Sequence, residues 1–197
     1  LKREKCCAGF LEMLGMEEEF ERASGECSKI VEGYDEVIVV CPMCYHAFKD
    51  FYGMENVVHL VEKVKEGIEK GVIKLEREVN ATVFLHDSCH MGRYAKMFDL
   101  PREILSSIPG LRLIEGTRTR ERARCCGGPI RVPFTEIRDK VAEAVVEESE
   151  KLGADGIVTE CPTCFHNIRA VSFGTVYDLL ELVAYSARLI DKIPVYE

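Results

Sequence analysis

Short runs of β-branched and aliphatic residues alternate with longer amphipathic stretches along the chain. The runs indicate buried strands, because strands covered on both faces carry continuous apolar residues. The longer stretches repeat their apolar residues at helical spacing. The predicted strands cover residues 37–40, 57–58, 82–85, 111–114, 156–159 and 176–177. The predicted helices cover residues 8–25, a segment that begins at Pro42, and residues 59–68, 101–107, 134–152, 162–171 and 178–190.

This alternation predicts an α/β fold in which small parallel sheets are flanked by helices. Cysteine motifs stand just after the predicted strands or just before the predicted helices. In open α/β sheets, such positions gather at the carboxyl ends of the strands. We therefore expect the cysteine loops to meet at one edge of the sheet.

The chain contains two copies of one unit. Residues 35–46, DEVIVVCPMCYH, match residues 155–166, DGIVTECPTCFH. Upstream, the pair at residues 6–7 matches the pair at residues 125–126; downstream, residues 57–60 match residues 175–178. These matches divide the sequence into two repeats. The first repeat covers residues 1–76 and is truncated at the N-terminus, and the second, complete repeat covers residues 77–197. The repeat would place the missing opening cysteine of the first unit about 36 positions before Cys6, ahead of the first residue.

Five thiols from three loops of the second repeat form the main candidate site. Gaps of 35 and 34 residues separate the first cysteine, the vicinal pair and the Cys-x-x-Cys motif. A structural zinc ion takes four ligands, and vicinal cysteines do not easily chelate one ion. Soft thiolates suit several irons, so the pattern favours an iron–sulfur centre over zinc or a thiol/disulfide pair. The predicted ligands are Cys89, Cys125, Cys126, Cys161 and Cys164.

The first repeat offers four thiols, Cys6, Cys7, Cys41 and Cys44, which would hold iron or satisfy zinc alone. Cys27 has no counterpart in the second repeat and is interpreted as a small buried apolar residue.

Several polar residues near the cysteines are candidates for supporting roles at the predicted metal site. His90, beside Cys89, is a candidate proton donor, whereas His46 and His166 recur after Cys-x-x-Cys and are interpreted as core residues beside the centre. His86 and Asp87, at a strand end, are interpreted as structural. A set of arginines would attract an anionic substrate, balance the charge of a cluster, or form a solvated loop: Arg93, Arg118, Arg120, Arg122 and Arg124.

Composition and charge narrow the function classes. The net charge is −8, which argues against nucleic acid as a partner. No apolar run approaches the length of a membrane helix, and no signal-peptide pattern opens the chain, so we expect a cytoplasmic location, peripheral at the membrane through a partner. Under these conditions the 10 cysteines indicate a metal or redox site rather than disulfides.

The ordered motif of Cys89, Cys125-Cys126-Gly127 and Cys161-x-x-Cys164 resembles the cysteine-rich CCG domain. This domain occurs in the B and D subunits of heterodisulfide reductase and in iron–sulfur subunits of anaerobic glycerol-3-phosphate, lactate and glycolate oxidoreductases. Residues 86–94, HDSCHMGRY, and residues 101–105, PREIL, are similar to the opening motif of the family. The sequence departs from the family pattern at residues 129–131, where PIR interrupts the usual glycine-rich run.

The resemblance implies that each complete motif holds a non-cubane [4Fe–4S] centre through five cysteines. The activity it implies is reduction of a disulfide at the centre, with the five cysteines of the second repeat acting through the cluster. The resemblance also implies a partner that delivers electrons, because this chain has no ferredoxin-type cysteine run of its own. The implied partners are a ferredoxin-type cluster domain or subunit, a flavoprotein, or a membrane cytochrome subunit. Two alternatives stay open: a non-catalytic electron-transfer subunit of a flavin dehydrogenase or quinone-linked complex, and a zinc-stapled interaction module.

Overall fold

The computed structural model describes residues 5–131 and 133–194, which form an α/β fold with two parallel sheets. A two-stranded sheet pairs β1 (Val37–Val39) with β2 (Val57–His59). The larger sheet has the strand order β4-β3-β5-β6, and all of its ladders are parallel. Its strands are β3 (Thr82–Leu85), β4 (Arg112–Ile114), β5 (Gly156–Thr159) and β6 (Thr175–Asp178). The predicted α/β class with small parallel sheets is therefore confirmed.

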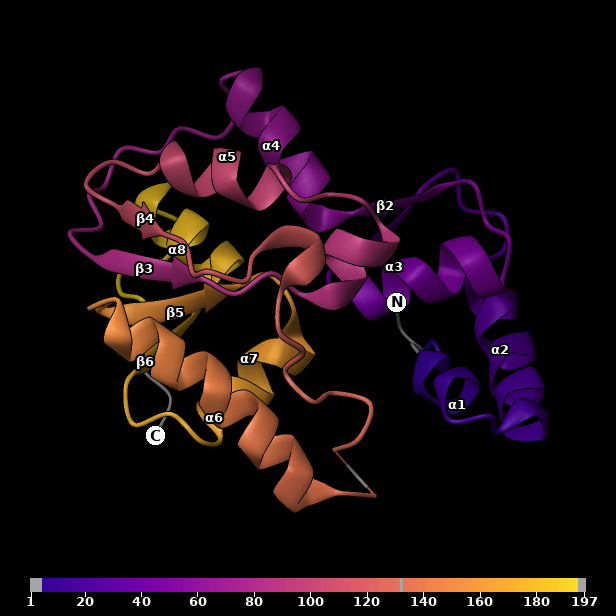
Figure 1. The fold of residues 1–197 in the computed structure, drawn as a ribbon. Helices are drawn as coiled ribbons and strands as arrows, with labels where there is room; N and C mark the ends of the chain where they lie inside the picture. The colour runs from indigo at the N-terminus through magenta and orange to yellow at the C-terminus, as the bar shows by residue number, and fades with distance from the viewer. Residues whose placement is uncertain (1–4, 132, 195–197) are drawn as a thin grey trace.

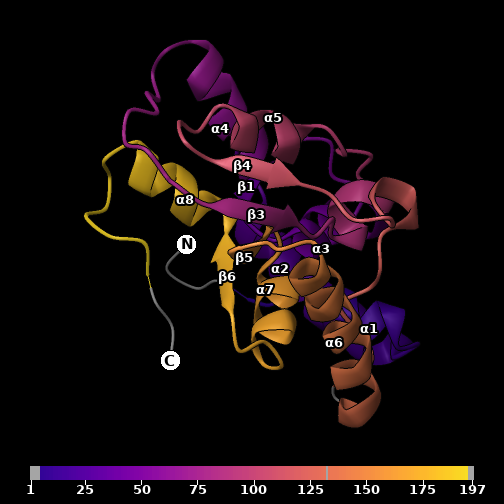
Figure 2. The same cartoon turned by 60° about the vertical axis from the view of Figure 1, so that its left-hand side comes forward.

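Helices cover both faces of the four-stranded sheet (Figures 1 and 2). α4, α5 and α8 lie on one face, and α6 and α7 lie on the other, while α1 and α2 lie beyond α3, away from the sheet. The α-helices are α1 (Gly9–Met13), α2 (Glu17–Val31), α3 (Pro42–His46), α4 (Leu60–Glu69), α5 (Leu100–Ser106), α6 (Thr135–Lys151), α7 (Pro162–Arg169) and α8 (Leu179–Ser186). The other turns are the π-helical η1 (Ala47–Phe51) and η2 (His90–Tyr94) and the 3₁₀ turn η3 (Arg120–Arg122).

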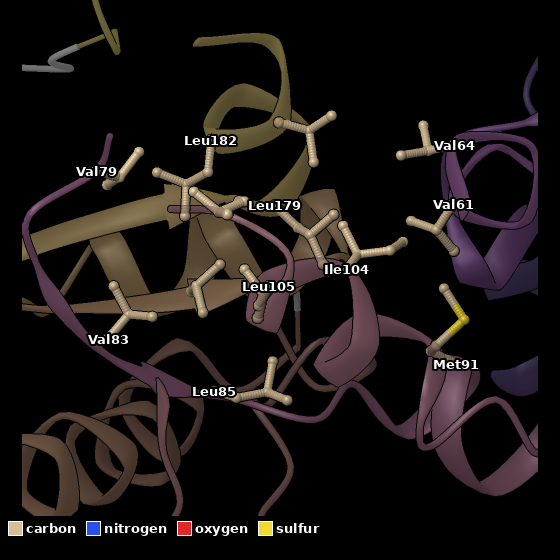
Figure 3. Packing of buried hydrophobic residues seen from close by; sticks show 13 residues of the cluster. Val61, Val64, Val79, Val83, Leu85, Met91, Ile104, Leu105, Leu179 and Leu182 are labelled. Carbon is tan, nitrogen blue, oxygen red and sulfur yellow. The ribbon is translucent and has the colours of Figure 1, made fainter. Parts of the chain in front are cut away.

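The alternation of side chains along β3 divides the core into two layers. Val83 and Leu85 face the layer of α4, α5 and α8 (Figure 3), whereas Phe84 faces α6 and α7. Successive residues of a strand point to opposite faces, so each short strand serves both layers. Val61 of α4 and Leu182 of α8 belong to one cluster, so the core joins the two predicted repeats. A boundary at residues 76 and 77 stays a prediction.

The strand ladders correct the predicted alignment of the repeats by one residue. Val37 pairs with Val57, and its counterpart Ile157 pairs with Val176. Residues 57–59 therefore correspond to residues 176–178, not 175–177. In this register the two residues that cap the following helices are equivalent: the His59 side chain accepts from Val61 N, and Asp178 accepts from Leu180 N.

Two helix predictions were wrong. The expected helix over residues 8–25 is two helices, because Gly15 takes a positive φ of 71° between them, and the second continues to Val31. Glycine adopts this conformation without the steric cost that other residues meet. The closing helix ends at Ser186, well before the predicted residue 190, and Arg188 has a φ of 60°.

Candidate metal centre

Three loops bring the five predicted thiols of the second repeat to one small cavity of about 20 Å³. Cys89 follows β3, the vicinal pair precedes α6, and Cys161 is the N-cap residue of α7. The structure thus gathers residues that are as far apart as 89 and 164 in the chain. The thiols that line this cavity are Cys89, Cys125, Cys126, Cys161 and Cys164.

Hydrogen bonds between thiols connect these residues in sequence around the cavity. Cys125 interacts with both Cys126 and Cys89. Cys126 interacts with Cys164, and Cys164 with Cys161. Hydrogen bonds from Cys126 and Cys89 lower the pKa of Cys125 to about 2, which favours its thiolate form. Contacts with neighbouring thiols and burial raise the pKa of the other four thiols, Cys89, Cys126, Cys161 and Cys164. Thiolate is the form that binds metal, so Cys125 is ready to bind, and the other four would release their protons on ligation.

Backbone geometry holds the vicinal pair against α7. The Gly127 amide donates to Cys125 Sγ at 3.3 Å, and Asn167 Nδ2 lies 3.8 Å from Cys126 Sγ and 3.3 Å from the Cys126 carbonyl oxygen. Gly127 has a φ of 80°, and a Cβ there would lie 2.9 Å from Arg138 Cγ. The turn therefore needs glycine both for its conformation and for its close approach to α6.

The thiols of the first repeat lie against those of the second. Cys41 is hydrogen-bonded to Cys161 and to Cys44, and Cys44 is hydrogen-bonded to Cys7. Cys6 is exposed, and its Sγ accepts from the Ala8 amide at 3.4 Å, as Cys125 accepts from Gly127. Three of these thiols, Cys7, Cys41 and Cys44, line a cleft of about 350 Å³, and Cys6 is not among its lining residues.

Cys27 is 3% exposed and packs with Cys7, Val31 and Val37. Its predicted buried position is confirmed.

A buried ion pair anchors the loop that carries Cys89. Arg102 of α5 makes two hydrogen bonds to Asp87, at 2.7 and 2.8 Å, and a further one to Glu115 at 2.6 Å. The Asp87 carboxylate also accepts from the Arg120 amide at 2.8 Å. The two motifs at residues 86–94 and 101–105 therefore meet in space, and Asp87 has the structural role predicted for it.

Three of the five predicted arginines are held by hydrogen bonds or ion pairs, and the other two are exposed to solvent. Arg93 donates to the Ala123 carbonyl at 3.0 Å, Arg124 pairs with Glu148 at 3.4 Å, and Arg120 pairs with Asp99. Arg118 and Arg122 are exposed.

Aromatic rings and histidines fill the junction between the two cysteine sets. His46 stacks on Tyr94 with ring centroids 4.2 Å apart, and His90 stacks on the same ring at 4.9 Å. His90 Nδ1 lies 3.4 Å from Cys89 Sγ, and burial lowers the pKa of His90 to about 4. His46 occupies the predicted core position, whereas its counterpart His166 is exposed and contacts Arg131, contrary to that prediction.

Two further buried side chains lie beside the thiols, and the sequence pattern alone did not identify either of them as part of the site's chemistry. Glu160 is 3% exposed, and its Oε1 accepts from the Ser88 amide at 3.2 Å. Burial raises the pKa of Glu160 to about 7, so this carboxyl can carry a proton near neutral pH. The second group is His86, whose ligating atom lies within 4.8 Å of those of Cys126 and Cys164. Strand alternation was the available signal, since it places His86 on the same face as Phe84.

The donor set suits a centre with more than one metal atom. Five soft thiols exceed the four donors of a tetrahedral structural zinc site. Cys126, Cys161 and Cys164 are also part of the apolar core between β5, α6 and α7, so a centre bound there would be shielded from water. Hydrogen bonds from Gly127 and Asn167 to the sulfurs are of the kind that stabilise thiolate-bound clusters.

None of the helices within residues 5–131 and 133–194 combines the length and the apolarity that a membrane span requires.

Comparison with known proteins identifies the family. Residues 1–49 and 83–169 match the family model of the CCG cysteine-rich domain. The chain is 33% identical over 97% of its length to the D subunit of "Dihydromethanophenazine:CoB–CoM heterodisulfide reductase" from Methanosarcina mazei, of which it covers 51%. It is 32% identical over 77% of its length to "Probable iron-sulfur-binding oxidoreductase FadF" of Bacillus subtilis, and covers 23% of that protein. It is 33% identical over 83% of its length to the B subunit of "Fumarate reductase (CoM/CoB)" from Methanothermobacter marburgensis, and covers 34% of it.

The chain thus spans about half or less of the length of these relatives. Their names describe subunits of oxidoreductase complexes and an iron–sulfur-binding oxidoreductase. The family model covers both the first cysteine set and the Cys89, Cys125-Cys126 and Cys161-x-x-Cys164 motifs. From the motifs, their convergence and these matches, we conclude that this chain belongs to the CCG cysteine-rich domain family.

Proposed function

We propose that this chain is an iron–sulfur oxidoreductase of the heterodisulfide reductase type, which reduces a disulfide at a non-cubane [4Fe–4S] centre. The observation that carries the proposal is the convergence of five thiols from three loops on one buried cavity. The similarity to the heterodisulfide reductase of Methanosarcina mazei supports the substrate class. The proposed ligands are Cys89, Cys125, Cys126, Cys161 and Cys164.

The reaction consumes two electrons and two protons and converts one disulfide into two thiols. A bound iron–sulfur centre supplies the capacity to accept and release single electrons. The electrons would come from a ferredoxin-type cluster, a flavoprotein or a membrane cytochrome subunit, because this chain carries no ferredoxin-type cysteine run. We infer that such a partner delivers electrons to the cysteine sets described above.

The residues around the cavity suit the protein's part of this reaction. The Asn167 amide and the Gly127 N–H orient the vicinal thiols, and the apolar layer of α6 and α7 excludes water. Glu160 can hold a proton near neutral pH, beside the α7 end of the site. His90 lies against Cys89, but burial lowers its pKa to about 4 and leaves its ring neutral near pH 7, so the proton-donor role predicted for it falls to Glu160 in this proposal.

The first cysteine set would hold a second centre next to the first. Cys41 and Cys161 are in hydrogen-bond contact, so the two centres would adjoin through these residues. We propose Cys6, Cys7, Cys41 and Cys44 as its ligands, with zinc as the alternative metal, since four thiols also satisfy zinc.

A second candidate function is electron transfer without catalysis. Thiol contacts run without interruption from Cys89 through Cys161 to Cys41 and Cys7, which is the arrangement needed to pass electrons between adjoining centres. The chain would then serve a flavin dehydrogenase or a quinone-linked complex.

Anaerobic reconstitution with iron and sulfide, followed by metal analysis and a disulfide assay, tests the proposal. We expect iron and sulfide to bind and reduced viologen to be oxidised faster when a disulfide is added. A Cys126→Ser variant should lose this dependence, whereas Cys27→Ser, a change of an equally buried cysteine outside the proposed ligand set, should keep it.

The remaining outcomes distinguish the alternatives. A reversible redox signal that disulfide leaves unchanged would favour electron transfer. Zinc without iron in protein prepared anaerobically would favour the zinc-stapled module and contradict both redox functions.

A further inference from the structure

A group of three buried ligand-type side chains lies at the base of the cysteine cavity. A ring nitrogen of His86 and the sulfurs of Cys126 and Cys164 all lie within 4.8 Å of one another. The three residues are 3%, 4% and 2% exposed. Imidazole and thiolate together are a common donor set for zinc and for iron–sulfur centres with mixed ligands.

The backbone around His86 points its ring toward the thiols. The His86 amide donates to the Val158 carbonyl at 2.9 Å, so the residue continues the ladder between β3 and β5 beyond Leu85. Strand alternation then places its side chain on the face of Phe84, which is the face that contains Cys126 and Cys164.

The ring of His86 has a buried polar atom for which the surrounding protein supplies no partner. Within the described part of the chain, His86 Nε2 is buried and makes no hydrogen bond. Buried polar atoms are nearly always paired, and one left unpaired destabilises the folded state. Coordination of this nitrogen to a metal atom held by Cys126 and Cys164 would give it a partner. His90 Nε2 is likewise buried and unpaired within the described residues, but His90 is not part of the group of three, and its Nδ1 lies 3.4 Å from Cys89 Sγ.

We propose that His86 is a nitrogen donor to the same metal centre as Cys126 and Cys164. The inference deepens the proposed function and rests on it in one respect, namely that a metal centre forms at these thiols. It adds imidazole to a donor set that sequence motifs define by cysteines alone.

Cobalt(II) tests the donor set without the need for iron. We would titrate cobalt(II) into the reduced, metal-free chain and into the variants His86→Asn and His59→Asn, and follow the thiolate-to-metal absorption. His59 is the matched control, because it is 0% exposed and its Nε2 also has no partner among the residues that the structure describes, but it lies outside the group of three. We expect His86→Asn to weaken cobalt binding at one site by at least about tenfold and to change its spectrum. We expect His59→Asn to leave that site unchanged.

The outcomes of the titration decide the proposal directly. An unchanged spectrum and affinity in His86→Asn would overturn it, as would absence of cobalt binding to the unaltered chain. Far-UV circular dichroism checks that the variants fold. If His86→Asn unfolds, His86→Gly with added imidazole replaces it, and recovery of the cobalt spectrum by imidazole supports the proposal while failure to recover counts against it.

Nitrogen couplings provide the second measurement, on the iron-loaded chain. Pulsed electron paramagnetic resonance of chain labelled with ¹⁵N-histidine should show a nitrogen coupling that is lost in His86→Asn and kept in His90→Asn. A cluster signal with no histidine coupling would show that His86 is not a ligand, and it would not contradict the proposed centre with five cysteine ligands. Failure of the unaltered chain to take up iron would count against the proposed function, and the cobalt titration would still decide the role of His86.

Discussion

The thiol of Cys41 is hydrogen-bonded to the thiol of Cys161, its counterpart in the second repeat. Both residues are N-cap residues of a helix that opens with proline, and both have extended backbone conformations. The contact joins two cysteine sets that are 120 positions apart in the sequence. A metal centre bound to one set would therefore interact electrostatically with the other set.

The first prediction concerns the reactivity of Cys41. Hydrogen bonds from Cys161 and Cys44 lower the pKa of Cys41 to about 2, so its thiolate persists when the pH falls. In the reduced, metal-free chain we expect the alkylation rate of Cys41 to stay nearly constant between pH 8 and pH 6. An ordinary thiol would slow by about tenfold per pH unit over this range. Mass spectrometry of peptides after timed iodoacetamide treatment measures the rate.

The variant Cys161→Ala provides the control for this mechanism. It removes the first hydrogen-bond donor to Cys41, so alkylation of Cys41 should become pH-dependent and slow at pH 6. Equal rates at pH 6 with and without the Cys161 thiol would show that the contact has no effect on Cys41.

The second prediction concerns the ion pair between Asp87 and Arg102. Asp87→Asn leaves the buried guanidinium with one carboxylate partner, Glu115, and keeps only one of the two side-chain oxygens that accept from Arg102 and the Arg120 amide. We expect a loss of about 2–4 kcal/mol in the free energy of unfolding, because removal of one member of a buried pair leaves an uncompensated charge. Asp99→Asn, at a solvent-exposed pair with Arg120, should cost far less than Asp87→Asn. Similar losses for both variants in urea unfolding would contradict this account.

The third prediction concerns the turn after the vicinal cysteines. Gly127→Ala should destabilise the chain by at least about 2 kcal/mol, since alanine meets both a positive φ and contact with Arg138. Ala8 takes the equivalent turn with a φ of 57°, so the conformation alone is tolerated. The contact with α6 makes the difference.

Gly25→Ala is the matched control for this turn. A Cβ at Gly25 meets nothing within 4 Å, and the residue lies inside α2. This variant should gain up to about 1 kcal/mol from helix propensity. Denaturant midpoints of both variants test the pair, and a neutral Gly127→Ala would show that the turn can shift.

The fourth prediction concerns pH-dependent stability at Asp178. Burial raises the pKa of this carboxyl to about 6, although it accepts from Leu180 N at 2.8 Å. Because the folded pKa lies above the unfolded value, the folded state binds more protons between pH 4 and pH 6. Its contribution to stability is therefore greatest below about pH 4 and declines as pH rises to about 6, by about 1–3 kcal/mol.

Asp178→Asn should remove this part of the pH dependence while an oxygen acceptor for Leu180 N remains. Asp155→Asn is the comparison, since Asp155 also accepts from a backbone amide, that of Thr82, but at a more exposed position. Thermal unfolding between pH 4 and pH 7 measures both variants. A pH profile unaltered by Asp178→Asn would exclude Asp178 as its source.

The local pattern of the sequence was sufficient for the strands that are short and apolar. The predicted strands at residues 82–85 and 156–159 match β3 and β5, because β-branched runs bounded by polar residues identify buried parallel strands. The pattern failed at residues 8–25, where the apolar residues continue past Gly15 but its left-handed backbone divides the helix. The apolar pattern indicates which residues are buried on one face of a helix, but it does not indicate where the backbone turns.

Cysteine spacing and strand order together predicted which thiols would meet within the second repeat, since the carboxyl ends of parallel strands share one edge. Only the tertiary structure decided that Cys41 would contact Cys161, that Asp87 would pair with Arg102, and that His86 would face Cys126. These contacts depend on how separate helices and sheets pack, and that packing is set by the shape of the whole core. The sequence alone therefore determined the repeated unit and its thiols, and the packing of one unit against the other determined the site's remaining neighbours.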